Sequence, residues 1–302
     1  MPRQPGIYVE IFLRAPLNEV WRLTQEPAEH QRWDLRFTEI RYLPRLDESE
    51  PQRFLYATRI GFGLVIHGSG ESVGERIAAG GEATSSLSFG SEDWKSLISE
   101  GSGYWRYIPL EDGVRFFTWY DYRTRLGVLG RVLDRSIFRP LMGWATAWSF
   151  DRLRLWLEQG QSPETSLSWA WIYGLARCGV AFIWIWHGLV PKLIAHDAAE
   201  RLMLAQAGVP DGLLVPIGVA EVVFGVAVLL LWRRRWPLAA TVAAMLFALC
   251  SVGLRSPEFV TAAFNPVTLN VSVIVLCVIA WLAMPHVPTA KRCVRVQLKG
   301  RT

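Results

Sequence analysis

The chain has 302 residues, a length typical of two domains, with 51% hydrophobic and 20% charged residues and a formal net charge of +5. Residues 1–165 carry 20 Lys and Arg against 22 Asp and Glu, whereas residues 166–302 carry 12 against 5. The excess positive charge therefore flanks apolar runs, as in membrane proteins, and forms no basic stripe of the kind that binds nucleic acid.

The cysteines and the N-terminus argue against two further classes. The four cysteines lie in apolar runs or near the C-terminus without a CxxC pair, which argues against a disulfide framework or a zinc site. The first residues contain no apolar segment, so we expect no cleavable signal. The first domain should therefore stay on the side of the membrane where it is made.

The first half of the chain predicts short strands followed by a long helix. Gly and Asp-Gly turns separate stretches rich in aromatic and β-branched residues. The predicted strands are residues 7–14, 54–66, 84–89 and 114–125. A short helix is expected at 18–24 and a long one at about 140–158. Four apolar residues of the long helix fall close to one face: Leu141, Ala145, Trp148 and Trp156. This order predicts an α+β domain over residues 1–160, in which a curved sheet wraps a helix.

Four apolar runs follow a polar linker at residues 161–168. They are residues 169–190, 213–232, 237–254 and 267–284. Each has 18 to 22 residues, and a helix needs about 20 to cross about 30 Å of hydrocarbon. A large soluble helical core is the alternative, but four such runs in so short a segment favour an all-α bundle of four transmembrane helices over residues 169–284.

Basic residues predict how this bundle is oriented. Arg233, Arg234 and Arg235 lie between the second and third runs, and residues 285–302 form a basic tail. Clusters of Lys and Arg mark the cytoplasmic side of a membrane. We therefore expect a multi-pass protein of the inner (cytoplasmic) membrane with its first domain and its C-terminus in the cytoplasm.

Short motifs in the first half match those of a known superfamily. They are Tyr8-Val9-Glu10-Ile11, Ala15-Pro16, Glu19-Val20-Trp21, Trp33-Asp34 and Phe150-Asp151-Arg152-Leu153. With these motifs, residues 5–158 resemble the SRPBCC superfamily of START-like and polyketide-cyclase-like helix-grip domains. The resemblance implies a cavity between the sheet and the long helix that holds a hydrophobic small molecule.

The membrane half has motifs of its own. They are Leu175-Ala176-Arg177, Trp186-His187-Gly188-Leu189-Val190-Pro191-Lys192, Glu200, Glu221 and Phe264-Asn265-Pro266. With these, residues 169–284 resemble the DoxX-like family of small four-helix membrane proteins. Some members are associated with quinone-linked or sulfur-linked oxidoreductase complexes, so the resemblance implies architecture more than it implies function.

Two charged residues lie inside predicted spans. At 1.5 Å per residue, Arg177 is about 12 Å deep from the cytoplasmic end and Glu221 about 12 Å deep from the opposite end. Their α-carbons would then differ by about 6 Å in depth, so we predict that they pair. Such a pair either fixes the packing of two spans or forms a polar site for a quinone headgroup, an anion or a proton.

Other polar residues near the span ends are candidate ligands in the membrane domain. Together with Arg177 and Glu221 they are His187, Lys192, Glu200, Asn265 and Asn270. His187 and His196 lack the helical spacing of metal ligands, so an interfacial segment with a snorkelling Lys192 is favoured over a metal site. Asn265 precedes a proline and predicts a helix cap, and Asn270 lies one turn deeper, where it is placed to bond across helices.

The candidate ligand-binding residues of the first domain are His67, Tyr104, Trp105, Trp119, Tyr122 and Arg123. An aromatic residue on a strand more often belongs to a core than to a ligand site, and both interpretations stay open here. Asp34 and Arg36 are expected to form a local ion pair. We find no nucleophile elbow, no catalytic triad and no paired carboxylates, and therefore assign no catalytic residue and no metal.

Three functions are compatible with these features. The first is a membrane-anchored protein that binds a lipid or another apolar small molecule. The second is a subunit of a quinone-linked membrane oxidoreductase complex, with quinone as the possible cofactor at Arg177 and Glu221. The third is a structural partner that docks other subunits of a membrane complex.

Overall fold

The computed structural model describes residues 5–45, 47, 50–77 and 81–297. These residues form two compact units, and the chain leaves the first unit after Ser166 and returns to it at Pro288. We call the first the sheet unit (1–166 with 288–302) and the second the membrane unit (167–287). Each unit has its own hydrophobic core, and the two are described separately.

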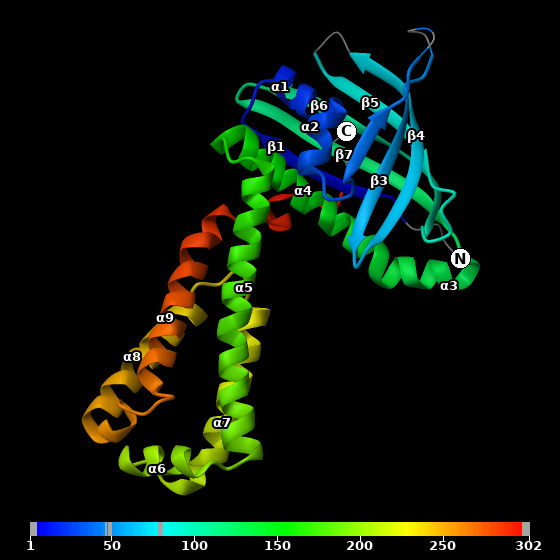
Figure 1. The fold of residues 1–302 in the computed structure, drawn as a ribbon. Coiled ribbons are helices and arrows are strands. Elements are labelled where there is room, and N and C mark those ends of the chain that lie inside the picture. The colour runs from blue at the N-terminus through cyan, green and yellow to red at the C-terminus, as the bar shows by residue number, and fades with distance from the viewer. Residues whose placement is uncertain (1–4, 46, 48–49, 78–80, 298–302) are drawn as a thin grey trace. The chain divides into compact units, whose positions relative to one another are not determined.

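The sheet unit contains one antiparallel sheet of seven strands in its described part (Figure 1). The strands are β1 (Ile7–Leu13), β2 (Glu39–Tyr42), β3 (Arg53–Gly61), β4 (Leu64–Ile77), β5 (Ala83–Gly90), β6 (Ile98–Leu110) and β7 (Gly113–Thr124). Their order is β1-β7-β6-β5-β4-β3-β2, so every neighbouring pair except β1–β7 is consecutive in the chain. The predicted α+β fold is confirmed, with β1 closing the sheet beside the last strand.

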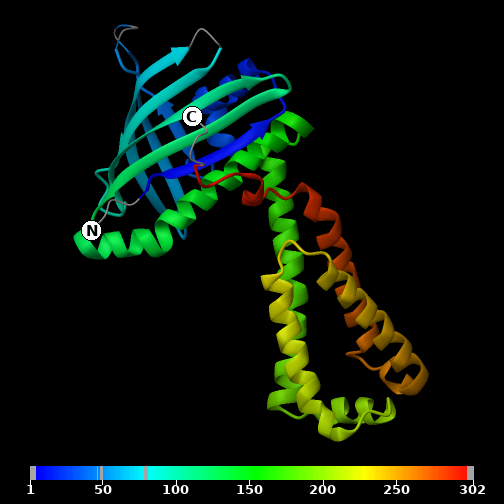
Figure 2. The same ribbon diagram turned by 180° about the vertical axis from the view of Figure 1, so that it is seen from behind.

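Two groups of helices complete the sheet unit. The helices are α1 (Leu17–Gln25), α2 (Pro27–Trp33), α3 (Gly127–Leu133), the π-helix η1 (Asp134–Phe138) and α4 (Arg139–Gln159). Figures 1 and 2 show α4 running along the sheet, and the Phe150 ring of α4 lies 4.6 Å from the Phe116 ring of β7. We call the face of the sheet that packs on α4 the inner face. Side chains alternate between the two faces, so residues directly paired with Phe116 across the sheet share the inner face.

The last described residues also belong to the sheet unit. Between the short helices η5 (Met284–His286) and η6 (Ala290–Arg292), the Thr289 amide donates to Asp151 in α4 at 2.7 Å. Val294 then pairs with Glu10 on the edge of β1. Part of the predicted basic tail at 285–302 thus packs on the sheet unit between Thr289 and Val294, because α4 offers it a buried carboxylate and β1 an open strand edge.

The membrane unit consists of four long apolar helices and short connecting ones. Its elements are α5 (Pro163–His187), the π-helix η2 (Gly188–Ile194), α6 (Ala198–Gln206), η3 (Asp211–Leu213), α7 (Leu214–Leu230), α8 (Trp236–Arg255), η4 (Pro257–Phe259) and α9 (Pro266–Ala283). Four of these segments are long and apolar enough to cross a membrane, which confirms the four predicted spans. Helix α5 begins inside the predicted linker 161–168, since Pro163 suits the first turn of a helix.

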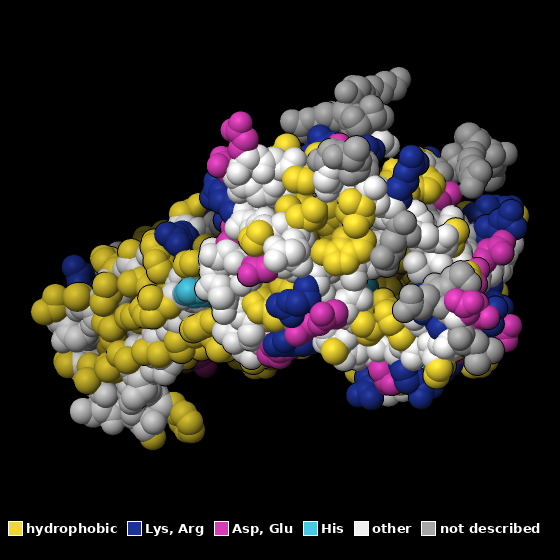
Figure 3. Space-filling view, turned by 90° about the horizontal axis from the view of Figure 1, so that it is seen from above, with side chains coloured by type: hydrophobic (Ala, Val, Ile, Leu, Met, Phe, Trp, Pro, Cys, Tyr) yellow, Lys and Arg dark blue, Asp and Glu magenta, His cyan; other side chains and the backbone are white. Residues whose placement is uncertain are grey.

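The surfaces of the two units differ: the surface of the membrane unit is mainly apolar, and that of the sheet unit is rich in charged residues. Figure 3 shows mostly hydrophobic side chains over the membrane helices and abundant Lys, Arg, Asp and Glu over the sheet unit. The core of the membrane unit is formed by small and aliphatic side chains around the buried Tyr173, among them Val180, Val228 and Val273.

Candidate functional site

A charged cluster lies at one end of the membrane unit. The Lys192 ammonium is 3.0 Å from the Glu221 carboxylate of α7 and 3.1 Å from the Glu200 carboxylate of α6. The Lys192 side chain is only 7% exposed, and each glutamate side chain 19%. Three of the predicted ligand residues are therefore brought together as one lysine between two carboxylates.

Close backbone packing makes this cluster possible. A Cβ atom on Gly218 of α7 would lie 2.9 Å from both the Gly188 carbonyl and the Lys192 Cβ. The first span also continues through η2 to Ile194 instead of ending near residue 190. Lys192 consequently lies within the helical segment against α7, and not in a solvated loop.

The predicted pair between Arg177 and Glu221 is not formed. Arg177 is fully buried and donates to the Val228 carbonyl at 2.8 Å and the Leu231 carbonyl at 2.7 Å, both at the end of α7. It donates further to the Arg234 carbonyl and to the Tyr173 hydroxyl. Arg177 meets the chain of α7 at Val228 and Leu231, seven or more residues beyond Glu221, or about 10 Å along the helix, so the two side chains lie at different levels. The polar site for quinone between Arg177 and Glu221 is thus absent.

The remaining membrane candidates have separate roles. The His187 carbonyl accepts from Lys192 at 3.3 Å, so His187 borders the charged cluster through its backbone. Asn265 caps α9 by accepting from the Thr268 amide at 2.9 Å, as its position before a proline predicted. Asn270 is buried on α9. The described residues include no group of three His, Cys, Asp or Glu that could hold a metal ion.

One part of the inner face of the sheet is filled. Phe116 of β7 pairs with Tyr107 of β6 and contacts Trp105, and the Trp33 ring of α2 lies 6.1 Å from both Trp105 and Phe150. All five side chains are at most 6% exposed. The space between α4 and strands β1, β7 and β6 is therefore occupied by aromatic rings at this end.

The inner face over β3, β4 and β5 is only half-buried. The row Phe54–Gly70–Phe89–Gly101 is directly paired across four strands and continues to Tyr122 on the inner face. A Cβ atom on Gly70 would lie 2.4 Å from the Phe54 ring, and one on Gly101 would lie 2.6 Å from the Phe89 ring. The rings thus lie flat on glycines, which leaves an aromatic floor instead of upright side chains.

Similar contacts flank this row on both sides. On one side the Tyr56 ring occupies the Cβ position of Gly68, and on the other side Leu87 pairs with Gly103, on which the Tyr120 side chain rests. Tyr56, Leu87 and Phe89 are all half-buried. We call Phe54, Tyr56, Leu87 and Phe89 the aromatic floor, since three of the four are aromatic. These four side chains lie on the same face of the sheet as Phe116 and are less buried than the rings at the β7 end.

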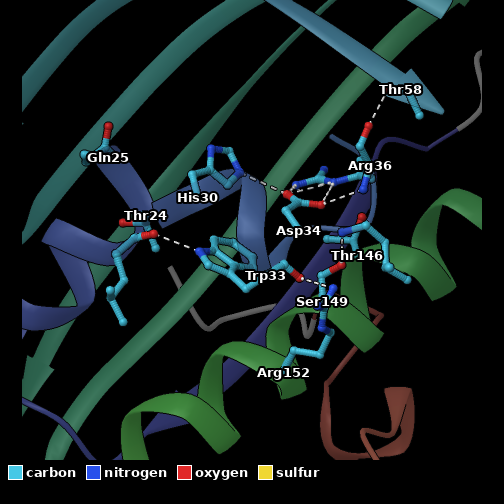
Figure 4. A network of polar contacts seen from close by, with 12 residues as sticks. Thr24, Gln25, His30, Trp33, Asp34, Arg36, Thr58, Thr146, Ser149 and Arg152 are labelled. Atoms are coloured by element: carbon cyan, nitrogen blue, oxygen red, sulfur yellow. Dashed lines mark hydrogen bonds and ion pairs between the residues drawn. The ribbon is translucent and has the colours of Figure 1, made fainter. Parts of the chain in front are cut away.

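A polar network lies at the C-terminal end of α2 and reaches α4 (Figure 4). Asp34 and Arg36 form the predicted ion pair with a shortest N–O distance of 2.6 Å, and Nε2 of His30 lies 3.1 Å from Asp34. The Arg36 guanidinium also lies 5.3 Å from the Tyr120 ring centroid. The network is held from α4, where Ser149 accepts from the Leu35 amide and Arg152 donates to the Trp33 carbonyl.

Burial and mutual attraction determine the charges in this network. Burial would raise the pKa of Asp34, but the Arg36 guanidinium and the His30 ring outweigh it and hold that pKa well below its usual range. Burial lowers the pKa of His30, although Asp34 acts in the opposite direction. At neutral pH the network therefore holds a neutral histidine beside an ion pair without net charge.

Four of the six candidates on the strands lie on the outer face. Tyr104 stacks on Trp119 with 6.0 Å between centroids, and Arg123 pairs with Glu100 in solvent. His67 pairs with Ala57 and directly precedes Gly68, which pairs with Tyr56 of the inner face, so His67 points to the outer face. These four do not line the space between sheet and helix, because adjacent residues of a strand point to opposite faces. This corrects the expectation for His67, Tyr104, Trp119 and Arg123.

The other two candidates lie on the inner face. Trp105 belongs to the filled end, and Tyr122 donates to Asp134 of η1 at 2.7 Å. Burial and Asp134 raise the pKa of the Tyr122 phenol. The aromatic floor and His30 were not among the sequence candidates. Strand parity counted from a buried residue such as Phe116 would have found the floor residues, but only with the register known. His30 lies on helix α2, where strand parity gives no signal.

A depression of about 460 Å³ also lies along β3–β6. It is lined by Phe54, Gly70, Phe89 and Gly101 and by residues that alternate with them, among them Arg53, Glu71, Ser88 and Glu100. Alternation places the last four side chains on the outer face, so the depression combines charged outer-face residues with Phe54 and Phe89 of the aromatic floor.

Sequence relatives agree with this architecture. The chain is 44% identical over 235 residues to "Uncharacterized membrane protein YndG" of Bacillus subtilis (strain 168), covering 78% of the chain and 80% of the relative. The chain belongs to the YndG family. Within it, residues 181–278 match the model of the DoxX-like family, so the membrane unit is DoxX-like.

Solved structures match the sheet unit. One is a STAR-related lipid transfer protein fragment from Xanthomonas axonopodis, with 16% identity, 52% of this chain and 96% of that chain covered, and a TM-score of 0.38. Another is the Zhui aromatase/cyclase from Streptomyces sp. R1128, with 13% identity, 49% and 95% coverage, and a TM-score of 0.34. The likeness concerns the START-like fold alone.

Proposed function

We propose that this member of the YndG family is a membrane-anchored binding protein that holds an apolar small molecule or lipid on the aromatic floor of its sheet unit. One observation carries the proposal: the inner face is filled by rings at the β7 end and only half-buried over β3–β5. Binding sites for small molecules are mostly apolar concave surfaces with a few polar groups.

The polar network supports a narrower ligand class. His30 is neutral at pH 7, and Arg36 is already engaged by Asp34 through bonds of 2.6 to 3.2 Å. A second anion would have to compete with Asp34 for the same guanidinium. A neutral molecule with one hydrogen-bonding group fits these charges better than a free fatty acid does.

Ligand binding is tested on the purified full-length protein in detergent. Mass spectrometry of an organic extract identifies what copurifies, and a thermal-shift screen of isoprenoids, quinones, sterol-like molecules and fatty acids ranks candidates. We expect micromolar affinity, about −8 kcal/mol, for a neutral apolar ligand. At one hundred times its dissociation constant, such a ligand stabilises the folded state by about 2.7 kcal/mol.

Two matched substitutions locate the site. Leu87→Trp adds bulk on the aromatic floor, whereas Leu55→Trp makes the same change on the outer face of β3. The first should abolish the thermal shift and the second should preserve it. Equal binding by both variants, or no shift with any compound of the panel, would remove the proposal.

We also propose that the sheet unit is cytoplasmic. Support comes from Arg233–Arg235 and from the basic residues after the fourth span. In a cysteine-free background, a membrane-impermeant reagent added to intact cells should label a cysteine replacing Asp211 and leave one replacing Ser102 of β6 unlabelled. Labelling of the Ser102 position would reverse the orientation.

A further inference from the structure

Helices α3, η1 and the start of α4 carry large apolar side chains that nothing in the described chain covers. We call Leu129, Leu133, Ile137, Leu141 and Trp144 the apolar stripe; their exposed fractions lie between 41% and 70%. The sequence placed Leu141 close to one helix face with Trp148, yet Leu141 is 53% exposed whereas Trp148 is buried. A run of exposed large hydrophobics along one helix marks an interaction surface.

The π-helical turn keeps this stripe on one face. In a regular α-helix, a four-residue spacing drifts by about 40° at each step. The five-residue η1 segment Asp134–Phe138 has a wider turn, which counteracts the drift that accumulates at the neighbouring steps. The three steps between positions 129, 133, 137 and 141 therefore keep these side chains closer to one side than an uninterrupted α-helix would.

The opposite side of the same helices is anchored to the sheet. Gly130 and Asp134 are buried, Asp134 accepts from Tyr122 of β7, and the Phe138 ring lies 6.0 Å from the Tyr122 ring. Thr146 of α4 bonds to Tyr120 at 2.9 Å. These contacts fix the rotation of the helix, so the apolar stripe must face away from the sheet.

A second apolar group lies at the same end of the sheet unit. The turn between β3 and β4 presents Phe62 fully to solvent with a φ of 50°, a left-handed conformation that disfavours a side chain of this size. Trp94 in the next loop is 85% exposed. That loop is tied to β4 through Lys95 and the Val65 carbonyl at 2.6 Å. It is tied to the segment between β7 and α3 through Leu97, whose carbonyl accepts from the Arg125 amide.

We propose that the apolar stripe, with Phe62 and Trp94, is a docking face that inserts into the surface of the bilayer that the protein spans. The occupant follows from connectivity and charge. Only residues 160–162 separate α4 from the apolar α5, a reach of about 10 Å, so the C-terminal end of α4 stays near the first span. Exposed Arg131 and Arg135 lie on the side of these helices away from the stripe, and interfacial helices carry basic residues on the polar side in this way.

This inference goes beyond ligand binding and does not depend on it. A docked stripe would hold α3 and the start of α4 parallel to the membrane surface, with the β3–β4 turn beside them. It assigns the apolar stripe a lipid partner of defined chemistry: an anionic bilayer surface.

The test uses the full chain reconstituted in vesicles of phosphatidylcholine with or without phosphatidylglycerol. In a cysteine-free background, single cysteines replacing Leu129, Phe62 or Ser102 are labelled with an environment-sensitive fluorophore. We expect a blue shift and strong quenching by brominated acyl chains at positions 129 and 62, and neither effect at position 102 on the outer face of β6. The double variant Arg131→Glu with Arg135→Glu should reduce the quenching at position 129 in anionic vesicles.

Two outcomes would overturn the proposal. If the fluorophore at position 129 emits like a probe in water, the stripe stays in solvent. A blue shift without lipid quenching would show that protein, such as a second copy of the chain, covers the stripe. Failure of ligand binding leaves these readouts unchanged, so the two proposals fail separately.

Discussion

Arg152 in the sheet unit and Arg177 in the membrane unit are both buried, with exposed fractions of 4% and 0%. Arg152 donates to the carbonyls of Arg32 and Trp33 at the end of α2, and to that of Pro163. Arg177 donates to carbonyls at and beyond the end of α7. One arginine lies in a unit with a charged surface and the other in a unit with an apolar one, yet both bind backbone.

In both units, backbone carbonyls stabilise a buried cation that has no carboxylate hydrogen-bonded to it. The last carbonyls of a helix have no partner within the helix and carry the negative end of its dipole. A guanidinium has five donors in a planar fork, so it can bind several such carbonyls at once. Sequence reasoning searches for an acid to pair with a buried arginine and overlooks this alternative.

The largest loss of stability is expected in the membrane unit. Exchange of charges by Arg177→Glu with Glu221→Arg should give no recovery over the single variants, because the two side chains do not meet. We expect each change to cost about 3–5 kcal/mol, the range for removing one partner of a buried charge. Thermal melting of the purified protein in detergent measures this loss.

The matched exchange is Lys192→Glu with Glu221→Lys. These residues do meet, at 3.0 Å, so this double variant should melt above at least one of its single variants. Recovery of the Arg177 exchange, or none for the Lys192 exchange, would contradict the assignment of partners.

A smaller effect is expected in the sheet unit. Arg152→Met leaves carbonyls of α2 without donors and should cost about 3 kcal/mol, since each unsatisfied buried group costs about 1–3 kcal/mol. Arg152→Lys should recover only part of this, because one ammonium cannot reproduce the planar fork. Unfolding followed by tryptophan fluorescence measures both variants. If lysine restored full stability, charge alone and not the carbonyl geometry would explain the arginine.

The smallest effect concerns His30, a buried base that faces a carboxylate instead of carbonyls. Burial lowers its pKa in the folded state, so below about pH 6.5 the unfolded chain binds a proton that the folded chain does not. Stability should therefore fall as pH decreases, by up to about 1.4 kcal/mol per pH unit. Melting between pH 7 and 5 should show this slope, and His30→Gln should flatten it. An unchanged slope in the variant would assign the titration elsewhere.

Local and compositional features were predictable from the sequence. The four spans were found because crossing hydrocarbon requires about 20 apolar residues in any tertiary context. The ion pair between Asp34 and Arg36 was predictable because the two residues are only two positions apart in the chain, so a turn brings their side chains together. The helix cap at Asn265 and the α+β fold followed from equally local signals and from recognisable motifs.

The faces of strands and helices were decided by tertiary structure alone. Tyr104 and Trp105 are adjacent and equally aromatic, and only the register with β7 shows which one faces α4. Leu141 belongs to an apolar pattern on one helix face. Hydrogen bonds of Asp134 and Thr146 to strand β7 fix the rotation of the helix, and the leucine is exposed. By itself, the sequence determined the number of spans, the fold class and the local pairs, because these depend on composition and short-range geometry. Tertiary structure decided which groups Arg177 and Lys192 contact and which side chains form the aromatic floor. These depend on the rotation and register of distant segments, which only the packing of the whole unit determines.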